Sequence, residues 1–338
     1  MIKVDTVNHP AAWLPASLNT DDWIVCFSPQ ECQQIVEVAR ELAALDCPTD
    51  KIADNIFRDR PGSLHKTLEV VSRDVVNGRG FILLRNFPID ELNEREAAYG
   101  YAAIGRYFGR LQAQNPKGDV LGKVTNLDKD WKTDPTARGY QTNMHMDFHS
   151  DSCDCVALLC VNPAKSGGLS AIVSSVSIYN HMREHTPELL ETLCRDFTYD
   201  RRGEEKNGVL PYYKTALFHE HHGEVFNRYC REYIESAQRF PDVPRLTPEQ
   251  IAAIDEFDRL CHSDQFILHM DFRRGDIQFL NNHVTLHSRT AFEDYQEQSK
   301  RRLLWRLYVS NREAAERPSC YESRFSDPER WALSAING

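Results

Sequence analysis

The sequence predicts an α+β protein in which helices buttress a jelly-roll barrel. Helical patterns are concentrated in the N-terminal third, the remainder is mainly short strand-like runs, and candidate metal ligands lie on such runs. The chain has 338 residues without an internal repeat or obvious linker, so we expect a single domain over 1–338. Within it we expect a helical part over about 1–77, the barrel over about 79–310 and a C-terminal extension over 311–338.

Helix signals mark four segments. Ser28-Pro29-Gln30-Glu31 is a capping box with proline at the first helical position, and it predicts an amphipathic helix through Leu45. A second helix is expected to end near Val76, and residues 90–108 have helical character. Thr247-Pro248-Glu249-Gln250 opens a further capped helix.

The expected strands are short runs of apolar and β-branched residues, which suit a pleated and largely buried surface. They cover residues 80–85, 155–161, 169–175, 276–280 and 303–309.

The bulk composition narrows the class of protein. A net charge of −10 and a pI near 5.7 argue against a nucleic-acid-binding surface. No run approaches the roughly 20 apolar residues of a membrane span, and the N-terminus lacks a secretory signal. The ten cysteines are scattered without a CxxC pair, which favours reduced thiols and a cytoplasmic location. We expect a small-molecule substrate as the partner, and the sequence leaves a homo-oligomer open.

The most informative motif is His149-Ser150-Asp151, read together with the distant His287. Side chains at i and i+2 of a strand point to the same side, so both HxD residues can aim into one cavity while Ser150 faces away. Two imidazoles and one carboxylate can occupy one face of an octahedron. The three positions left open suit non-haem Fe(II) oxygen chemistry.

The HxD assignment is ambiguous from the residues alone, because His145-Met146-Asp147 is a second HxD directly upstream. On a regular strand His145, Asp147, His149 and Asp151 would share one face, opposite Met144, Met146 and Phe148.

Other histidines offer further candidates. His283 and His287 have a four-residue spacing that would suit a zinc pair on a helix, but the Glu of HExxH is missing and the flanks are strand-like. His181 and His185 fall in a helical pattern and His219, His221 and His222 in a polar turn, so we interpret these five as structural or solvated.

Two arginines follow His287 on an expected strand. Arg302 and Arg306 would share a face with Leu304 and Tyr308 and point into the barrel. A buried guanidinium needs an anionic partner, and a carboxylate bound as a fork is the natural one. The alternative is a pair of surface salt bridges on an edge strand.

Taken in order, the motifs resemble those of the taurine dioxygenase/TfdA-like superfamily of Fe(II)- and 2-oxoglutarate-dependent oxygenases, also grouped as clavaminate-synthase-like. The resemblance runs from about Arg79 to Val309. It is carried by Phe148-His149-Ser150-Asp151, by Ser166-Gly167-Gly168-Leu169-Ser170, by the segment 275–289 and by Arg301-Arg302-Leu303-Leu304-Trp305-Arg306. It implies a double-stranded β-helix fold.

The resemblance also implies the site. His149, Asp151 and His287 would bind the iron, because the apolar strand and Gly-Gly that follow fit this HxD and not the upstream one. Arg302 would hold the distal carboxylate of 2-oxoglutarate, and Ser170 stands where the family often carries a cosubstrate-contacting threonine. Arg306 and His145 become tentative substrate contacts.

The implied cofactors are Fe(II), 2-oxoglutarate as cosubstrate and O2. The implied reaction releases succinate and carbon dioxide while an unactivated C–H bond is hydroxylated. Asp151 favours hydroxylation or desaturation over halogenation, since family halogenases carry a small residue there.

Three alternatives stay open beside hydroxylation. One is a desaturase or another oxidative tailoring enzyme of the same family. A second is a zinc-dependent hydrolase that uses His283 and His287. The third is a non-catalytic barrel that binds an acid through Arg302 and Arg306.

Overall fold

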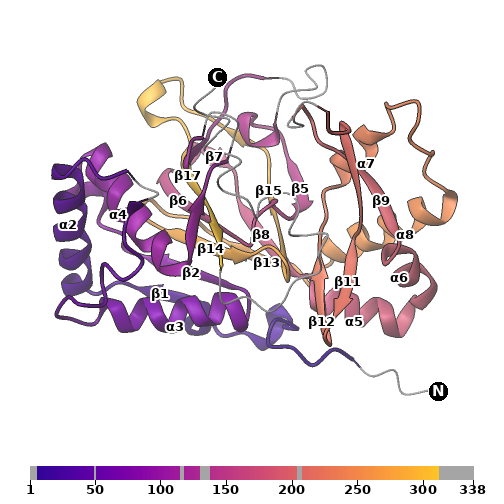
Figure 1. Ribbon diagram of the computed structural model, residues 1–338, viewed down its shortest axis with the longest axis horizontal. Helices are drawn as coiled ribbons and strands as arrows, with labels where there is room; N and C mark the ends of the chain where they lie inside the picture. Colours follow the sequence, from indigo (N-terminus) through magenta and orange to yellow (C-terminus); the bar gives the residue numbers. More distant parts are fainter. Residues whose placement is uncertain (1–5, 49–50, 115–117, 130–137, 204–207, 312–338) are drawn as a thin grey trace.

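The computed structural model describes residues 6–48, 51–114, 118–129, 138–203 and 208–311; the expected C-terminal extension beyond 311 lies outside them. The described chain is layered (Figure 1). Two sheets lie in the middle, helices α2, α3 and α4 flank them on one side, and helices α5 to α8 lie on the other. This is the predicted jelly-roll core buttressed by helices.

The four helices marked in the sequence are present, whereas α1, α6 and α7 were not predicted. The capping box at Ser28 is present, with Ser28 Oγ accepting the Glu31 amide, and the expected apolar stripe of that helix is buried. Thr247 caps the helix that follows it in the same way. The helices are α1 (Thr20–Trp23), α2 (Pro29–Ala44), α3 (Leu64–Asn77), α4 (Glu94–Phe108), α5 (Ser175–His185), α6 (Pro187–Leu193), α7 (Arg231–Ala237) and α8 (Pro248–Cys261).

The larger sheet has the order β1-β2-β14-β6-β17-β3, with β4 also paired to β17. The pair β1–β2 is parallel and the others are antiparallel. Its edge strand β1 comes from the N-terminal part of the chain. The strands are β1 (Ile24–Cys26), β2 (Phe81–Arg85), β3 (Arg110–Gln112), β4 (Leu121–Val124), β6 (Cys155–Asn162), β14 (Ile277–Asn281) and β17 (Leu303–Ser310).

The smaller sheet has the order β13-β8-β15-β5 and is antiparallel throughout. Its strands are β5 (Met146–His149), β8 (Ser170–Ser174), β13 (Leu268–Met270) and β15 (Thr285–Arg289). Three two-stranded pairs complete the described strands: β7 (Ser166–Gly167) with β16 (Phe292–Glu293), β9 (Asp196–Asp200) with β10 (Tyr212–Ala216), and β11 (Phe218–His221) with β12 (Glu224–Asn227).

Strand β17 illustrates how alternation divides the core. Trp305, Leu307 and Val309 pack toward the helices, in a cluster with residues of α2, α3 and α4. Leu304 and Tyr308 face the other way, in a cluster that also holds Ile172 and Met270 of the smaller sheet. Leu304 of this second face also lines a pocket between the two sheets.

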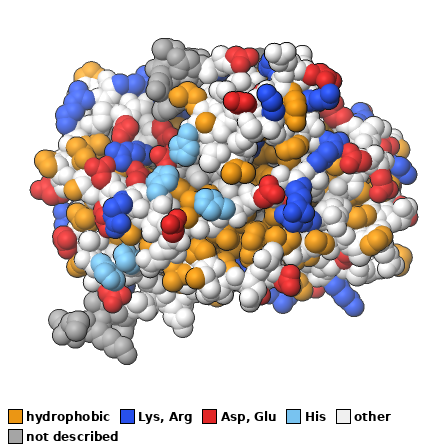
Figure 2. Space-filling view, turned by 180° about the vertical axis from the view of Figure 1, so that it is seen from behind, with side chains coloured by type: hydrophobic (Ala, Val, Ile, Leu, Met, Phe, Trp, Pro, Cys, Tyr) orange, Lys and Arg blue, Asp and Glu red, His pale blue; other side chains and the backbone are white. Residues whose placement is uncertain are grey.

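The surface of the described chain carries both signs of charge. Figure 2 shows acidic and basic side chains interspersed over one face, around a central stretch where hydrophobic side chains are visible. Among the described helices, none has the length and apolarity needed to cross a bilayer.

Candidate active site

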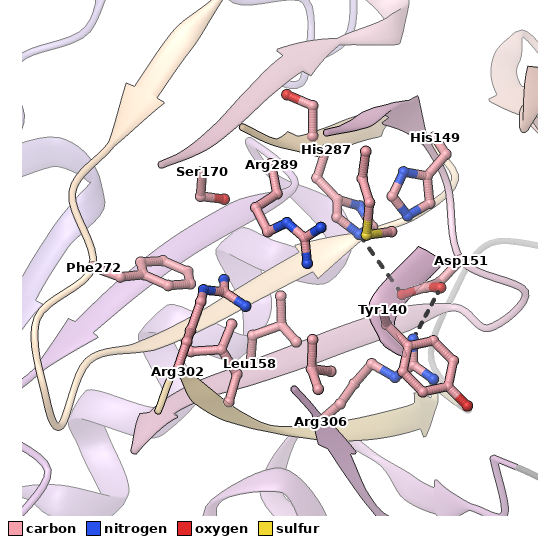
Figure 3. Close-up of a pocket in the computed structure, with 14 residues that line it drawn as sticks. Tyr140, His149, Asp151, Leu158, Ser170, Phe272, His287, Arg289, Arg302 and Arg306 are labelled. Carbon is pink, nitrogen blue, oxygen red and sulfur yellow. Dashed lines mark ion pairs between the residues drawn. The ribbon is translucent and has the colours of Figure 1, made fainter. Parts of the chain in front are cut away.

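A pocket lies between the two sheets and holds most of the residues singled out from the sequence. It encloses about 470 Å³ of space between atoms, part of which is open to solvent. Figure 3 shows His149, His287 and Asp151 at one end with Arg306 beside Asp151, and it shows Arg289 and Arg302 farther along the pocket. The lining residues are Val124, Tyr140, Met146, His149, Asp151, Leu158, Ser170, Phe272, His287, Ser288, Arg289, Arg302, Leu304 and Arg306.

Two imidazoles meet at the metal-ligand end. His149 is the last residue of β5 and His287 lies on β15, directly opposite it in the register. Their ring centroids are 4.3 Å apart. The Nδ1 of His149 lies 2.8 Å from the carbonyl oxygen of Asp147, so an Nδ1–H donated there leaves Nε2 as the ring's metal-binding nitrogen.

Asp151 completes this end from the loop after β5. Its Oδ2 lies 3.8 Å from Nε2 of His287, and its Oδ1 accepts a 2.8 Å hydrogen bond from the hydroxyl of Tyr308. Arg306 Nη1 lies 3.6 Å from the same Oδ1. Asn282 Oδ1 accepts the Asp151 amide at 3.0 Å, which fixes the backbone of this loop.

The charge states at this end suit a cation. Burial by itself would raise the pKa of Asp151, but Arg306, His287, His149 and the Tyr308 hydroxyl outweigh it and hold that pKa below its usual value. Burial, reinforced by His149, lowers the pKa of His287 to about 3. At neutral pH the carboxylate is therefore ionised and the His287 imidazole is neutral, as metal ligands must be.

Strand β5 is not a regular strand. His149 pairs with His287 and Met146 with Arg289, so three steps on β5 match two on β15, which is a β-bulge. Met146 and His149 are three residues apart and would face opposite sides of a regular strand. Because of the bulge both line the pocket, whereas Asp147 does not. The expectation that His145, Asp147, His149 and Asp151 share one face is wrong for this reason.

Three arginines line the pocket. Arg302 and Arg306 do so together with Leu304, which confirms the shared face predicted from the sequence. Arg306 is held by several partners: Nε donates to Gln114 Oε1 at 2.8 Å, and the guanidinium lies 4.6 Å from the Tyr140 ring centre. Burial opposes its charge, but Tyr308 and Asp151 outweigh burial and raise its pKa.

The buried guanidinium groups of Arg289 and Arg302 make few of the hydrogen bonds that their N–H donors allow. They are 6% and 4% exposed, and Nε and Nη1 of Arg289 and Nη1 of Arg302 have no hydrogen-bond partner among the described residues. Their guanidinium carbons lie 4.8 and 5.1 Å from the centre of the same Phe292 ring. Burial lowers the pKa of Arg302 to about 10, and burial with the neighbouring Arg302 lowers that of Arg289 to about 9. Buried donors of this kind mark a place for an anion.

The Gly-Gly segment supports this end of the pocket by close packing. Both glycines have positive φ, 70° at Gly167 and 67° at Gly168. A Cβ on Gly168 would lie 3.1 Å from Arg302 Nε, and one on Gly167 would lie 2.2 Å from the carbonyl oxygen of Ala291. The segment thus lets the chain pass directly against Arg302 and β16. Ser170 follows on β8, where it is buried and pairs with Arg289 across the strands.

Arg289 was missed as a site residue at the sequence level, although a signal was present. It stands two residues after His287, and i, i+2 positions of a strand face the same side. If His287 points into the barrel, Arg289 must do so as well.

The remaining histidines lie elsewhere. His145 does not line the pocket and has a half-exposed side chain beside Asp147. His283 is buried with Nε2 3.1 Å from Asp154 Oδ1, so it does not pair with His287 at the pocket. His181 and His185 lie on α5, as the pattern predicted. His219 and His221 belong to strand β11 and not to a turn; only His222 and Gly223 form the turn of that hairpin.

Comparisons with known proteins show the family to which the chain belongs. Residues 49–308 match the family model described as taurine catabolism dioxygenase TauD, TfdA family. The chain is 31% identical over 267 residues to FR-33289 synthase of Streptomyces rubellomurinus, covering 77% of this chain and 76% of that protein. It is 26% identical over 322 residues to the taurine hydroxylase-like protein SAT17 of Stachybotrys chartarum, covering 91% and 81%.

Solved structures share the fold. Asparagine oxygenase in complex with Fe(II), 3-hydroxyasparagine and succinate superposes with a TM-score of 0.68 at 17% identity, covering 85% of this chain and 93% of that one. The non-heme iron oxygenase OrfP in complex with Fe and alpha-ketoglutaric acid gives a TM-score of 0.65 at 14% identity, covering 85% and 94%.

Proposed function

The chain belongs to the TauD, TfdA family of dioxygenases, and from this premise we propose that it is an Fe(II)- and 2-oxoglutarate-dependent enzyme that hydroxylates a C–H bond of a small molecule. The single observation that carries the proposal is one pocket with two ends. One end has two imidazoles and a carboxylate, and the other has buried guanidinium donors without partners.

We propose His149, Asp151 and His287 as the iron ligands. The chemistry of the donor set fits a ferrous ion, since two neutral imidazoles and one ionised carboxylate leave further coordination positions free. The neutral state of His287 and the ionised state of Asp151 support this role. With iron and 2-oxoglutarate bound, the centre supplies the oxidising power: substrate, O2 and 2-oxoglutarate give hydroxylated substrate, succinate and carbon dioxide.

We propose Arg302 and Ser170 as contacts for the distal carboxylate of 2-oxoglutarate, and we add Arg289 to them. The orphaned donors of Arg289 and Arg302 support this assignment, because a carboxylate would satisfy several of them at once. Asp294 offsets part of the cost of burying the two cations side by side, and a bound anion would offset more of it. The site therefore favours a dicarboxylate long enough to reach both ends of the pocket.

The other lining residues position groups and exclude water. Val124, Leu158, Leu304 and Phe272 give the pocket apolar walls, which strengthen each electrostatic contact inside it. Arg306 lines the pocket and contacts Asp151, so we propose that it orients this carboxylate in addition to the tentative substrate contact. The proposed substrate contact of His145 gains no support from its place outside the pocket lining.

The test is oxygen-dependent succinate formation. Iron-loaded protein is incubated with 2-oxoglutarate and a panel of small acids and amino acids, and succinate and the oxidised product are quantified together. We expect at least one substrate to give succinate and a product heavier by one oxygen atom in equal amounts. His149→Ala should abolish both, whereas His185→Ala on the distant helix α5 should not. Normal turnover by His149→Ala would refute the proposal.

The same experiment separates the alternatives. A product lighter by two hydrogens would identify a desaturase that uses the same site. Activity that needs zinc and ignores 2-oxoglutarate would favour a hydrolase, and binding of acids without oxygen consumption would favour a non-catalytic barrel. The separation of His283 from the pocket removes the structural basis of the zinc-hydrolase reading.

A further inference from the structure

A second group of metal-binding side chains lies outside the pocket. We propose that His145, Asp147 and His262 form a distinct site for a late first-row divalent cation such as Zn²⁺. None of the three lines the pocket between the sheets. The upstream HxD pair, His145 and Asp147, which the residues alone also offered as iron ligands, lies together with the distant His262.

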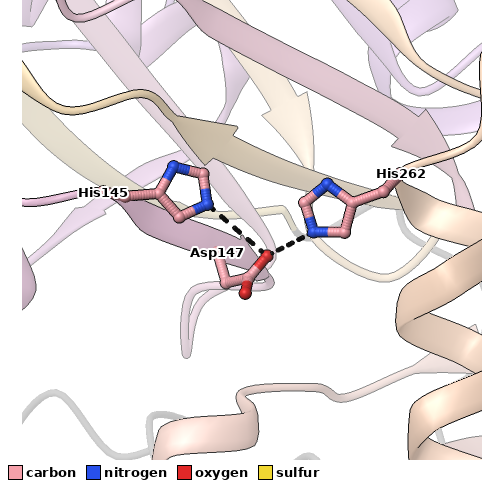
Figure 4. Close-up of side chains that lie close together, drawn as sticks. All are labelled: His145, Asp147 and His262. Carbon is pink, nitrogen blue, oxygen red and sulfur yellow. Dashed lines mark hydrogen bonds and ion pairs between the residues drawn. The ribbon is translucent and has the colours of Figure 1, made fainter.

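The three side chains converge on one point. His262 Nε2 lies 2.6 Å from Asp147 Oδ1 and His145 Nε2 lies 3.7 Å from the same oxygen. One donor atom from each residue lies within 4.8 Å of the other two. Figure 4 shows the two imidazoles on either side of the carboxylate, with their nitrogens turned toward it.

The β-bulge in β5 creates this arrangement. On a regular strand Asp147 would face the same side as His149. The extra residue releases Asp147 from that face, and its carboxylate reaches His262 at the C-terminal end of α8. Phe148 helps to hold His262, because the two rings make an edge contact with centroids 5.2 Å apart.

The donor set selects the kind of cation. Two imidazoles and one carboxylate suit zinc, nickel or copper, whereas calcium and magnesium prefer oxygen ligands alone. Metal–ligand bonds of about 2.0–2.2 Å require the donors to lie closer together than the widest pair does here. Side chains that are 49%, 40% and 44% exposed have the freedom to make that small adjustment, and the exposed side leaves room for water ligands.

An ordinary surface pair between His262 and Asp147 would explain their hydrogen bond. It would not explain why a second imidazole turns toward the same oxygen atom. Asp147 also touches the candidate iron site, because its carbonyl oxygen accepts the Nδ1–H of His149. A cation bound outside would therefore hold in place the residue that orients His149.

The test is zinc stoichiometry on the full chain, prepared without a histidine tag and stripped with a chelator. Calorimetric titration with Zn²⁺ should show two equivalents for the wild-type protein, one at the candidate iron site and one at the outer site. His262→Ala should remove one equivalent, and His145→Ala should weaken the same equivalent by at least about 10- to 100-fold, the loss that even indirect supporting groups cause. His185→Ala, which removes another exposed histidine, should keep both.

Crystals of the zinc-soaked protein give a second readout that does not depend on any variant folding. Anomalous scattering at the zinc edge should place an ion among His145, Asp147 and His262. The proposal is overturned if His262→Ala and His145→Ala both bind as many zinc equivalents, and as tightly, as the wild-type protein, or if the anomalous map has no peak there.

Discussion

Tyr308 contacts only one of the two carboxylate oxygens of Asp151, and the two oxygens therefore have different surroundings. The Tyr308 hydroxyl donates a 2.8 Å hydrogen bond to Oδ1, which also faces Arg306, while Oδ2 faces His287 at 3.8 Å. Oδ1 is therefore occupied by protein donors, and Oδ2 is the oxygen left for a metal ion. The contact joins the larger sheet, which carries Tyr308, to the loop after β5.

This division predicts the effect of Tyr308→Phe. The substitution removes the hydroxyl that holds Asp151, and loss of such a supporting group weakens metal binding by about 10- to 100-fold. Iron affinity should be measured anaerobically by equilibrium dialysis. Tyr295→Phe, at a residue 41% exposed, should bind iron like the wild-type protein. Equal affinity for wild type and Tyr308→Phe would show that the hydrogen bond does not support the ligand.

Arg289 should affect stability and cosubstrate binding in opposite directions. Arg289→Met removes a buried, poorly compensated cation, so the ligand-free protein should unfold at the same or a higher temperature. The rise in melting temperature that 2-oxoglutarate gives to the wild type should shrink, because binding weakens by at least about tenfold. Arg259→Met, on the surface of α8, is the matched control. An unchanged 2-oxoglutarate shift in Arg289→Met would exclude Arg289 from the cosubstrate site.

The Gly-Gly segment predicts a contrast between two glycines of similar conformation. Alanine at Gly168 would press on Arg302 Nε at 3.1 Å, whereas alanine at Gly203, with φ 79°, meets no atom of the described residues within 4 Å. Both substitutions cost roughly 1–2 kcal/mol of backbone strain. Only Gly168→Ala should raise the KM for 2-oxoglutarate, since it alone displaces the arginine. If both variants raise it equally, the effect is strain and not contact with Arg302.

Glu31 predicts a pH dependence of folding. Its buried carboxylate accepts hydrogen bonds from the Ser28 amide and from the hydroxyls of Ser28, Ser63 and Thr67. Burial opposes ionisation, but these donors outweigh it and lower the pKa of Glu31 below 4.5. Its contribution is therefore complete above that value and is lost as the pH falls through the lower folded-state pKa.

Glu31→Gln tests this directly. The variant should be less stable to urea by about 1–3 kcal/mol at pH 7, and the difference from wild type should narrow only below about pH 4.5. Glu256→Gln, at a carboxylate of α8 that pairs with the exposed Arg259, should change stability far less. A difference that stays constant down to pH 3 would contradict the assignment.

Local sequence patterns determined much of this protein. Helix α2 begins at its capping box, and β17, with the residue directly before it, presents Arg302, Leu304 and Arg306 to the pocket. A helix cap depends on residues three or four positions apart, and the shared face of a strand depends on the alternation of its side chains. Both can therefore be predicted from the local sequence. The motif order was equally informative about the family, because 49–308 match one family model.

Only the tertiary structure showed which side chains of residues 144–151 face the pocket, because strand alternation alone predicts the wrong set. The bulge in β5 arises from pairing with β15, more than a hundred residues downstream. No residue type in 144–151 predicts a bulge. Because of the bulge, Asp147 lies beside His262 whereas His149 lies beside His287. The two HxD pairs, which are alike in sequence, therefore lie in different places. The burial of donors on Arg289 and Arg302 that have no partner among the described residues is likewise a property of packing, since a guanidinium becomes costly only when distant strands close over it.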